Sequence, residues 1–438
     1  MRFSTAASLA LAASLATTAF AQITPTRVGP VSQYGQLMTG KNSQGKGQIY
    51  GSCEGVKDGA EVQVRGMSLY WSLMPQAVEF WSEEGVSTMV RDMNIQIVRA
   101  AMATGNEDWQ GGYKGYASDP NTQKNLMKTV VEAAIKNDIY VIIDWHSHEA
   151  HKQTDAAKNF FKEMAETYGQ YDNVIFEVYN EPQQISWSEV KNYANQVIQV
   201  IRQYSDNLVL VGNPSWDQNP SDAIGNEVND SKKNTAYTLH YYANSHMWSG
   251  NYDWGGESEG SKGEKAMNAG LSVFVSEWGT ANSDGNGNPD QSRNKSWQDY
   301  MNKHKLSWAN WSASYINEGT AAFQDGSNKN SLQYTTSGNL VKGYLATNPT
   351  SYKACKAEEE VGIKAPAIAG GFSVSLEGKT LNIAGGNANV EIYSLLGNKF
   401  MAVENVSGAL SLASLPSGSY VVRVNTKEGS KTMRVQVR

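Results

Sequence analysis

VIFEVYNEP (Val174–Pro182) and LSVFVSEWGT (Leu271–Thr280) are the two stretches that decide the fold of this chain. Each is an apolar run of β-branched and aromatic residues that Pro or Gly ends, a pattern typical of a buried strand. Each run also places a glutamate, Glu181 or Glu277, at its carboxyl end. A carboxylate at the end of a buried strand is costly unless it is paired or used. The two stretches therefore predict a pair of carboxylates assembled across one site.

Six further runs have the same strand character, and amphipathic helical patterns separate them. With Val174–Asn180 and Ser272–Glu277, the predicted strands are Val62–Ser68, Ile95–Met102, Ile139–Trp145, Leu208–Gly212, Thr235–Tyr242 and Leu306–Ser312. The predicted helices are Ala77–Met93, Asn121–Asn137, Thr154–Tyr168, Ser188–Tyr204, Lys262–Ala269, Gln291–His304 and Gly338–Ala346. This alternation over about 300 residues indicates an α/β chain, a (β/α)₈ TIM barrel. An open doubly wound sheet is the rival, but the Gly-rich first turn typical of that fold is missing.

The flanking segments differ in composition from the predicted barrel. Residues 1–21 have Arg2, an apolar run and a small-x-small site, the pattern of a signal peptide, so we expect a protein that is secreted or held at the cell surface, with no membrane span. We assign 22–355 to the barrel, preceded in it by a short hairpin over Val31–Val56, and 356–371 to a linker. Residues 372–438 read as short alternating strands with Gly turns, a small β-rich module.

The 438 residues contain two cysteines, Cys53 and Cys355. They lie near the start and the end of a predicted closed barrel, whose first and last elements are neighbours. In an oxidising compartment a disulfide is favoured over two free thiols.

Composition narrows the class of ligand. The formal net charge of −6 argues against nucleic acid, whose binding rests on Lys and Arg contacts to phosphate. The chain has 12 Trp and 22 Tyr but only 18% charged residues, which favours uncharged, hydroxyl-rich ligands that stack on aromatic faces. The simplest interpretation of this aromatic content is that most of these residues fill a large core.

Polar and aromatic side chains recur at the carboxyl ends of the predicted strands, the face where barrel enzymes place their sites. These candidates are Arg99, His146, Asn180, Glu181, Trp216, His240, Tyr242, Glu277 and Trp311. Two carboxylates on separate strands are the apparatus of glycoside hydrolysis, in which one protonates the leaving oxygen and the other attacks the anomeric carbon.

The strand motifs resemble those of glycoside hydrolase family 5, in its bacterial endo-β-1,4-glucanase (cellulase) branch. The similarity covers roughly Val31–Leu345, and its motifs are RGMS (Arg65–Ser68), IVRAAM (Ile97–Met102), VIIDWH (Val141–His146), VIFEVYNEP, LHYYANSH (Leu239–His246), VFVSEWGT and LSWANWSAS (Leu306–Ser314). The resemblance implies a retaining enzyme, expected to be a monomer, that acts on β-1,4-glucan without metal or cofactor.

The resemblance also implies a role for each matching residue. Glu181 of the NEP motif is the acid/base, and Glu277 of SEWG is the nucleophile. With these roles, we expect Arg99 to lower the pKa of Glu277, and burial beside a second negative charge to raise the pKa of Glu181. Arg99 and Tyr242 donate hydrogen bonds to Glu277, and Asn180 binds the sugar 2-hydroxyl. His146 and His240 contact the sugar or orient the acid/base. Trp311 is a stacking platform on the glycon side, and Trp216 is one on the leaving-group side. One position departs from the branch: Tyr70 stands where a His is usual, two residues after GMS. For the next residue, Trp71, the sequence fits a stacking platform and a core residue equally well. Asp144 is interpreted as a structural residue rather than as a third catalytic acid.

Three alternatives stay open. The first is the same mechanism on another β-glycan (mannan, xyloglucan or mixed-linkage glucan), with endo or exo attack. The second is a metal-dependent hydrolase built on His146 and His148. The third is a catalytically silent carbohydrate-binding barrel. Finally, residues 372–438 resemble the sorting domains of type IX-like secretion. The resemblance rests on VEIYSLLGNKF (Val390–Phe400), the LPSGSYVVRV stretch (Leu415–Val424) and the terminal basic strand. It implies contact with secretion machinery and delivery to the cell surface.

Overall fold

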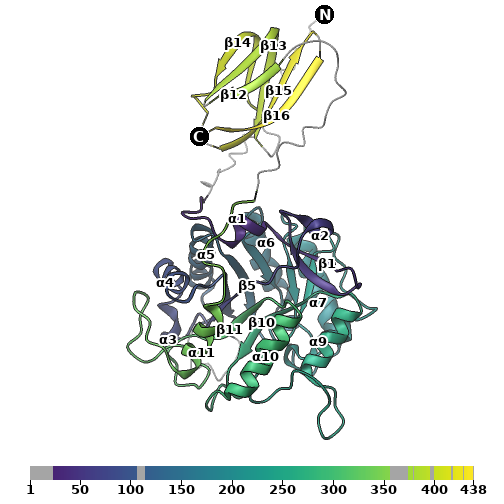
Figure 1. The fold of residues 1–438 in the computed structure, drawn as a ribbon, viewed down its shortest axis with the longest axis vertical. Coiled ribbons are helices and arrows are strands. Elements are labelled where there is room, and N and C mark those ends of the chain that lie inside the picture. Colours follow the sequence, from purple (N-terminus) through teal and green to yellow (C-terminus); the bar gives the residue numbers. More distant parts are fainter. Residues whose placement is uncertain are drawn as a thin grey trace, which may run out of the picture. The chain divides into compact units, whose positions relative to one another are not determined.

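The computed structural model of the chain describes residues 23–105, 114–355, 373–377, 379–394, 399–415, 418–427 and 429–437. The predicted signal peptide and linker lie outside these residues. The chain forms two compact units, Met1–Lys356 and Ala357–Arg438, which are drawn in Figure 1. Within the described ranges every helix is too short or too polar to span a bilayer.

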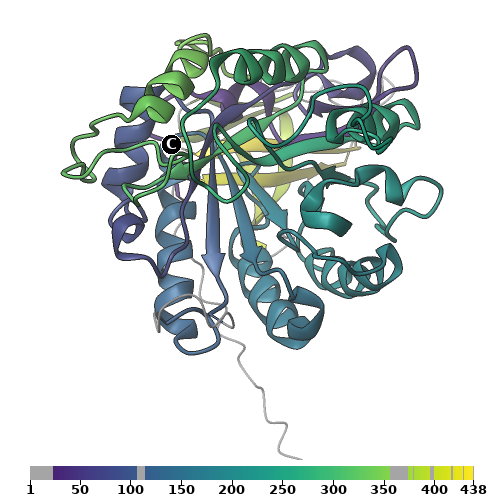
Figure 2. The same cartoon turned by 90° about the horizontal axis from the view of Figure 1, so that it is seen from below.

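The first unit is a closed barrel of eight parallel strands, as predicted. The strands are β3 (Arg65–Leu69), β4 (Ile97–Ala103), β5 (Tyr140–His146), β6 (Val174–Glu177), β7 (Val209–Val211), β8 (Thr235–Thr238), β10 (Val273–Gly279) and β11 (Trp308–Ala313). They pair in chain order, and β11 pairs with β3 to close the sheet. Figure 2 views this barrel from below, with helices outside the strands.

Side chains along each strand alternate between the inside and the outside of the barrel. Ile97, Tyr140 and Ile142 join one buried cluster, whereas their neighbours Val98, Val141 and Ile143 join the main core under the helices. This period of two is the pleat of a strand that is buried on both faces. It fixes which residues can reach a site inside the barrel.

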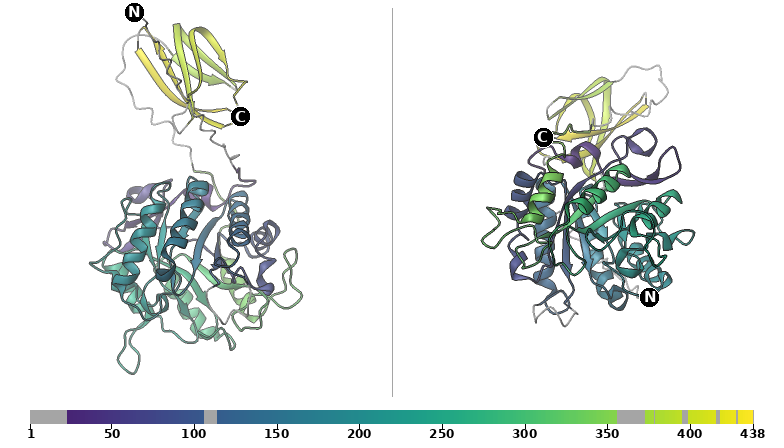
Figure 3. Two further views of the ribbon diagram at one scale, coloured as in Figure 1. Left: turned by 180° about the vertical axis from the view of Figure 1, so that it is seen from behind. Right: turned by 60° about the horizontal axis from the view of Figure 1, so that its bottom comes forward.

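Amphipathic helices cover the outside of the barrel, as Figure 3 shows from behind. They are α4 (Glu83–Met93), α5 (Pro120–Lys136), α6 (Thr154–Tyr168), α7 (Trp187–Ile201), α9 (Glu259–Asn268), α10 (Gln291–Lys303) and α11 (Thr336–Leu345). In α7 the Ser186 side chain accepts from the Glu189 N–H, and Glu189 reaches back to the Ser186 N–H, so a capping box starts the helix. Its Val190, Ala194 and Val197 are buried at helical spacing.

A short antiparallel hairpin closes the amino-terminal end of the barrel. Strands β1 (Leu37–Lys41) and β2 (Gly47–Gly51) pair between the short helices α1 (Pro30–Tyr34) and α2 (Gly55–Asp58). Leu37 and Ile49 of the hairpin join the cluster inside the barrel. The hairpin therefore plugs the end opposite the predicted site.

A disulfide joins Cys53 and Cys355, whose Cα atoms are 5.7 Å apart. The bond closes a loop of 302 residues around the whole barrel. A cross-link over so long a loop removes much conformational entropy from the unfolded chain, which favours the folded state.

Two predicted elements are interrupted. The helix predicted over Ala77–Met93 is two helices, α3 (Pro75–Val78) and α4, because Ser82 caps α4 by accepting from the Gly85 N–H. The strand predicted over Thr235–Tyr242 is β8 followed by β9 (Tyr241–Tyr242). The break between them occurs where the His240 N–H donates to the Asp217 carbonyl instead of to a neighbouring strand.

The second unit is an all-β module of five antiparallel strands, β12 (Ser373–Glu377), β13 (Thr380–Ser394), β14 (Lys399–Ser411), β15 (Gly418–Thr426) and β16 (Gly429–Val437). The prediction of a small β-rich module is confirmed, and its strand pairings form one connected sheet. β14 pairs with one side of the long β13, and β12 and then β15 pair with the other. Val390, Ile392, Val422 and Val424 lie in its core.

Candidate active site

Arg99 on β4 is the hub of the site and is fully buried inside the barrel. Its Nη1 donates to Glu277 Oε2 at 2.7 Å, and its Nε donates to Glu177 Oε2 at 2.8 Å. Its Nη2 lies 2.9 Å from Asp144 Oδ2 and donates to Asn180 Oδ1 at 2.7 Å. Burial opposes a charge here, but these three carboxylates hold the pKa of Arg99 well above its usual value. One guanidinium thus orients the side chains of three other strands.

Glu277 lies on β10 and is almost completely buried. Besides the Arg99 contact, its Oε1 accepts a hydrogen bond from the Tyr242 hydroxyl at 2.8 Å. The pairing of β10 with β11 shifts register between Val275 and Trp278. This irregularity lets the consecutive residues Ser276 and Glu277 both contact the interior network.

Glu181 lies in the turn that follows β6 and has a left-handed backbone, with φ of 50°. Its N–H donates to Asp217 Oδ2 at 3.0 Å, and its Oε1 lies 3.0 Å from His240 Nδ1. His148 lies on the same side, with Nδ1 3.1 Å from the Glu181 carbonyl oxygen. The acid/base candidate is therefore fixed through both its backbone and its carboxylate.

His240 is buried among carboxylates. Its Nε2 lies 2.9 Å from Ser276 Oγ, which in turn donates to Glu177 Oε1 at 2.9 Å. Burial lowers the pKa of His240, but Asp217, Glu177 and Glu181 outweigh that effect and raise it well above its usual value. In the ligand-free site His240 is thus an imidazolium that donates from Nδ1 to Glu181.

This imidazolium reverses the pKa order that the sequence predicted for the two glutamates. Burial raises the pKa of Glu181, but the hydrogen bond and charge of His240 together with the charges of His148 and Arg99 outweigh burial, so that this pKa is lowered. Burial and the Glu181 charge raise the pKa of Glu277 despite Arg99. The prediction was wrong for the free protein because it left out the proton on His240.

An aromatic wall adjoins the network and consists of Tyr70, Trp71, His146 and Trp311. The rings of His146 and Trp311 are parallel within 4°, with centroids 5.4 Å apart, and Tyr70 lies 4.8 Å from Trp311. Trp71 Nε1 donates to His146 Nε2 at 2.6 Å, so His146 Nδ1 carries the proton and donates to Asp144 at 2.7 Å. Burial lowers the pKa of His146 well below its usual value, which agrees with a neutral ring.

The contacts of this wall bear on several of the residues that the sequence singled out. Trp71 and Trp311 are buried in the ligand-free state. Tyr70 donates to Glu318 Oε1 at 3.1 Å, so the residue at the usual His position has a carboxylate partner. Asp144 connects Arg99 with His146, a structural role as assigned. Both nitrogens of His146 have protein partners, so His146 does not face His148 as the metal-binding alternative requires.

A cavity of about 370 Å³ opens beside the network. It is lined by Glu181, Trp216, Gln218, His240, Tyr242, His246 and Ser283. Trp216 is 38% exposed, so its indole is available to a ligand. Since Glu181 is on this wall, the cavity lies on the side of the acid/base candidate, where the leaving group of a glycoside would bind.

The structure brings Glu181, Glu277, Arg99, Asn180, His240 and Tyr242 into one hydrogen-bonded network, with Tyr70, His146 and Trp311 next to it and Trp216 on the cavity. Glu177, Asp217, Ser276 and Glu318 belong to the site as well but were not singled out from the sequence. Burial raises the pKa of Glu177, but Arg99 lowers it to about 2, so that this carboxylate stays charged.

The fold and site define a class: a (β/α)₈ barrel with one buried and one partly buried carboxylate after two of its strands, which is the architecture of many glycoside hydrolases. The model of the cellulase family (glycosyl hydrolase family 5) matches residues 56–317. The chain belongs to this family.

Curated relatives and a solved structure are similar to the chain. Endoglucanase Z from Dickeya dadantii (strain 3937) is 42% identical over 295 residues, which cover 67% of this chain and 64% of that protein. An endoglucanase from Clostridium saccharobutylicum is 35% identical over 320 residues, 70% of this chain and 66% of the relative. The chain thus spans slightly less than two thirds of both relatives. The catalytic domain of Thermobifida fusca endoglucanase Cel5A is 28% identical with a TM-score of 0.62, covering 73% of this chain and 100% of that one.

Proposed function

We propose that this chain is a retaining endo-β-1,4-glucanase. The observation that carries the proposal is the spacing of the two glutamates: one carboxylate oxygen of Glu181 and one of Glu277 lie within 4.8 Å of each other. Retaining glycosidases place their carboxyl groups about 5–5.5 Å apart, and inverting ones about 6.5–9.5 Å. The endoglucanases among the relatives support the choice of β-1,4-glucan.

The proposed reaction has two steps. In the first, a Glu277 oxygen attacks the anomeric carbon, the bond to the leaving oxygen breaks, and Glu181 gives its proton to that oxygen. In the second, Glu181 takes a proton from water, the water oxygen attacks the same carbon, and Glu277 is released. Arg99 and Tyr242 hold Glu277 at 2.7 and 2.8 Å and so fix the direction of attack.

Other residues support these steps. Asn180 is oriented by Arg99 and is proposed to bind the sugar 2-hydroxyl. The proton for the leaving group is held between His240 and Glu181, whose atoms are 3.0 Å apart. Trp311 and Trp216 are proposed as platforms on the glycon and leaving-group sides. The reaction as written uses no metal or cofactor.

The test compares polysaccharides. Reducing-sugar release and viscosity are measured on carboxymethylcellulose, mannan, xyloglucan and mixed-linkage glucan, with and without chelator. We expect a rapid fall in viscosity on carboxymethylcellulose that chelator does not change. Turnover of mannan alone would keep the mechanism and replace the substrate, and slow loss of viscosity at equal sugar release would indicate exo attack. Loss of activity with chelator would support a metal-dependent hydrolase, and binding without turnover a silent barrel.

Glu181→Ala gives a result that depends on the leaving group. Polymer hydrolysis falls by about 10²- to 10⁴-fold, the usual contribution of a general acid. Aryl cellobiosides with acidic phenol leaving groups lose much less in the first step, because such groups leave without a proton. The measurement is kcat/KM against the pKa of the phenol, and Glu149→Ala, at an exposed glutamate, is the control. An equal loss on every substrate would contradict the acid/base role.

For the flanking parts of the chain, we propose export with the second unit as a sorting or attachment module. Residues 372–438 hold seven Lys and Arg against four Asp and Glu, opposite in sign to the whole chain. The test expresses the full chain in a bacterium with a type IX-like system and follows both units with antibodies in cells, envelope and medium. Retention of both units inside the cell would contradict the proposal.

A further inference from the structure

The short turn α8 (Pro214–Asp217) has an unusual backbone. Ser215, Trp216 and Asp217 have φ values of 62°, 56° and 60°, so three consecutive residues are left-handed. L-residues adopt this conformation rarely, and it persists only where the surroundings enforce it. None of the three is glycine, which indicates that the contacts of the turn are what hold it.

The turn is bound to the backbone that carries the acid/base. The N–H groups of Ser215 and Trp216 each donate at 2.9 Å, to the carbonyls of Gln183 and Pro182. The fully buried Asp217 side chain joins the two segments: Oδ2 accepts from the Glu181 N–H at 3.0 Å, and Oδ1 accepts from the Asn213 N–H. Asp217 thus spans its own turn and enforces the left-handed Glu181.

The same carboxylate faces His240. Asp217 Oδ2 lies 3.4 Å from His240 Nε2, and the Asp217 carbonyl accepts from the His240 N–H at 2.8 Å. The charged groups around the ring are Glu177 on β6, Glu181 after β6, Asp217 on α8, Glu277 on β10 and Arg99 on β4. Of these, Asp217 is the carboxylate that the two-step mechanism above does not use and that contacts both His240 and Glu181.

We propose that Asp217 is the positioning residue of the acid/base: its carboxylate fixes the backbone of Glu181 and places a negative charge beside His240 that keeps a proton on the His240–Glu181 pair. This inference rests on the proposed function of Glu181. Burial raises the pKa of Asp217 to about 7 although His240 opposes this, so Asp217 gains its charge near neutral pH. The charge is therefore present where the pair would otherwise lose its proton.

The sign of the expected pH effect follows from that charge. A negative charge holds a proton on its neighbours, so removing it releases the proton at lower pH. In Asp217→Asn we expect the alkaline limb of kcat/KM to move to lower pH by about one unit or more, the usual effect of one charge within 4–6 Å. The loss of kcat/KM in Asp217→Asn grows with the pKa of the leaving phenol, as it does in Glu181→Ala, but this loss is smaller than in Glu181→Ala. Asp222→Asn, five residues on in the 3₁₀ helix Pro220–Ala223, is the matched control and leaves both profiles unchanged.

Other outcomes overturn the proposal. An unchanged pH profile with an equal loss on all substrates makes Asp217 merely structural. If Asp217→Asn does not fold, NMR of ¹⁵N-labelled histidines in the wild-type protein decides, because His240 must stay charged above neutral pH; titration at or below its usual value contradicts the proposal. If the wild type cleaves no β-glycan, the proposed function fails, whereas the NMR titration still tests the contact with Asp217.

A second inference comes from the hairpin between Met247 and Ser258, the next segment of the chain after β9 and His246. Trp254 at its tip is 78% exposed, the highest value among large hydrophobic residues in the described ranges. Its indole lies parallel to the Tyr252 ring within 8°, at 5.3 Å between centroids. Gly256 lies against the indole, where any Cβ would meet the ring. Tyr252 OH donates to Glu259 Oε2 at 2.5 Å, so the base of this stack is fixed to α9.

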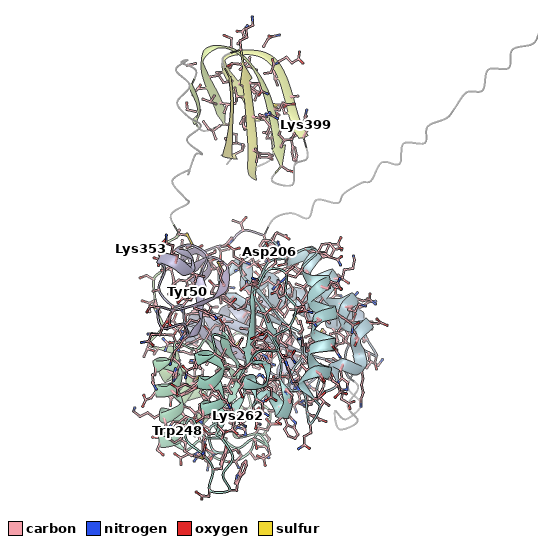
Figure 4. All side chains as sticks on the ribbon, turned by 90° about the vertical axis from the view of Figure 1, so that its right-hand side faces the viewer. Tyr50, Asp206, Trp248, Lys262, Lys353 and Lys399 are labelled. Carbon is pink, nitrogen blue, oxygen red and sulfur yellow. A yellow bond between two sulfur atoms is a disulfide. The ribbon has the colours of Figure 1, made fainter. Side chains whose placement is uncertain are left out.

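The hairpin is rigid and begins at the cavity. Its strands are tied by the Tyr252 N–H to the Gly256 carbonyl at 2.8 Å and by the Ser258 N–H to the Gly250 carbonyl at 3.0 Å. At its foot, Trp248 packs over Arg293, which donates to the carbonyl of His246, a cavity residue. Figure 4 labels Trp248 at this foot. These contacts fix the aromatic face of the hairpin next to the leaving-group side, and such a face suits the C–H face of a sugar.

We infer that Trp254 and Tyr252 form a distal platform for the leaving-group end of a β-glucan chain; this also rests on the proposed function. In Trp254→Ala, with Ile224→Ala as the exposed apolar control, affinity electrophoresis on soluble glucan should show binding weakened roughly tenfold, as one aromatic contact implies. Turnover of aryl cellobiosides, which have no glucose unit on the leaving-group side, stays unchanged. Unchanged binding, or an equal loss on the short substrates, overturns the inference. Wild-type binding without turnover would refute only the enzyme proposal.

Discussion

Glu277→Gln is expected to abolish turnover of β-glucan, with kcat reduced by about 10⁴- to 10⁶-fold, the range seen when a covalent nucleophile is lost. The amide keeps the shape of the carboxylate: its oxygen accepts from Arg99, and its NH2 group donates to the Tyr242 hydroxyl oxygen, so the protein folds. It cannot attack the anomeric carbon, and no glycosyl intermediate forms. The measurement is single-turnover and steady-state hydrolysis of carboxymethylcellulose and aryl cellobiosides.

Unlike Glu181→Ala, Glu277→Gln should fail equally on activated and natural substrates, because every substrate, whatever its leaving group, reacts through the attack by Glu277. Glu264→Gln is the control, since Glu264 forms a surface ion pair with Lys46 at 3.6 Å. Residual activity above about one part in a thousand, after contamination by wild type has been excluded, would show that another group is the nucleophile.

The sequence was sufficient for the barrel because parallel strands buried on both faces leave continuous apolar runs. Val141–Ile143 and Val273–Val275 are of this kind, and the helices between them have a 3.6-residue period. The interruptions at Ser82 and His240 could not be predicted, because each depends on one backbone N–H that donates to a capping hydroxyl or to the carbonyl of a distant turn.

The positions of the two glutamates that we propose as catalytic could also be predicted, since each follows a strand within a specific motif. Glu177 was missed although a signal for it exists: the period of two places it inside the barrel, and it pairs in register with Asp144 on β5. Ser276 was missed in the same way, since the period of two places it inside the barrel with Phe274, whereas Glu277 reaches the interior because the register shifts beside it. Asp217 carries no such signal, because it acts through a left-handed turn. The order of the Glu181 and Glu277 pKa values could not be predicted, because it depends on how these two carboxyls share protons with the groups around them, His240 above all.

Arg99→Leu is expected to cause the largest loss of stability of any single substitution in the site. Arg99 contacts Asp144, Glu177 and Glu277 in a region without exposure to water. Removing one partner of a buried ion pair costs about 3–5 kcal/mol because the other charge is left unpaired, and here three carboxylates lose their cation. The free energy of unfolding should fall by at least that amount, which is measured by denaturant unfolding with activity assayed on the folded fraction.

The pH dependence separates this effect from loss of packing. Without the cation, the pKa values of the buried carboxyls rise in the folded state above those in the unfolded chain, so the folded state binds more protons. The destabilisation of Arg99→Leu is therefore greatest at high pH and shrinks as the pH falls and these carboxyls become protonated. A deficit that is constant with pH would mean that Arg99 stabilises by packing alone.

Arg202→Leu is the matched control for this prediction. Arg202 is also buried, but it pairs with one carboxylate, Asp230, at 2.7 and 2.8 Å, and that pair lies outside the site. Arg202→Leu should lose stability and keep the activity of its folded fraction. Arg99→Lys retains a charge but cannot reach all the contacts of the planar guanidinium, so its folded fraction should lose activity. Stability and catalysis are joined at Arg99 because the cation that makes three buried carboxylates tolerable also aims Glu277.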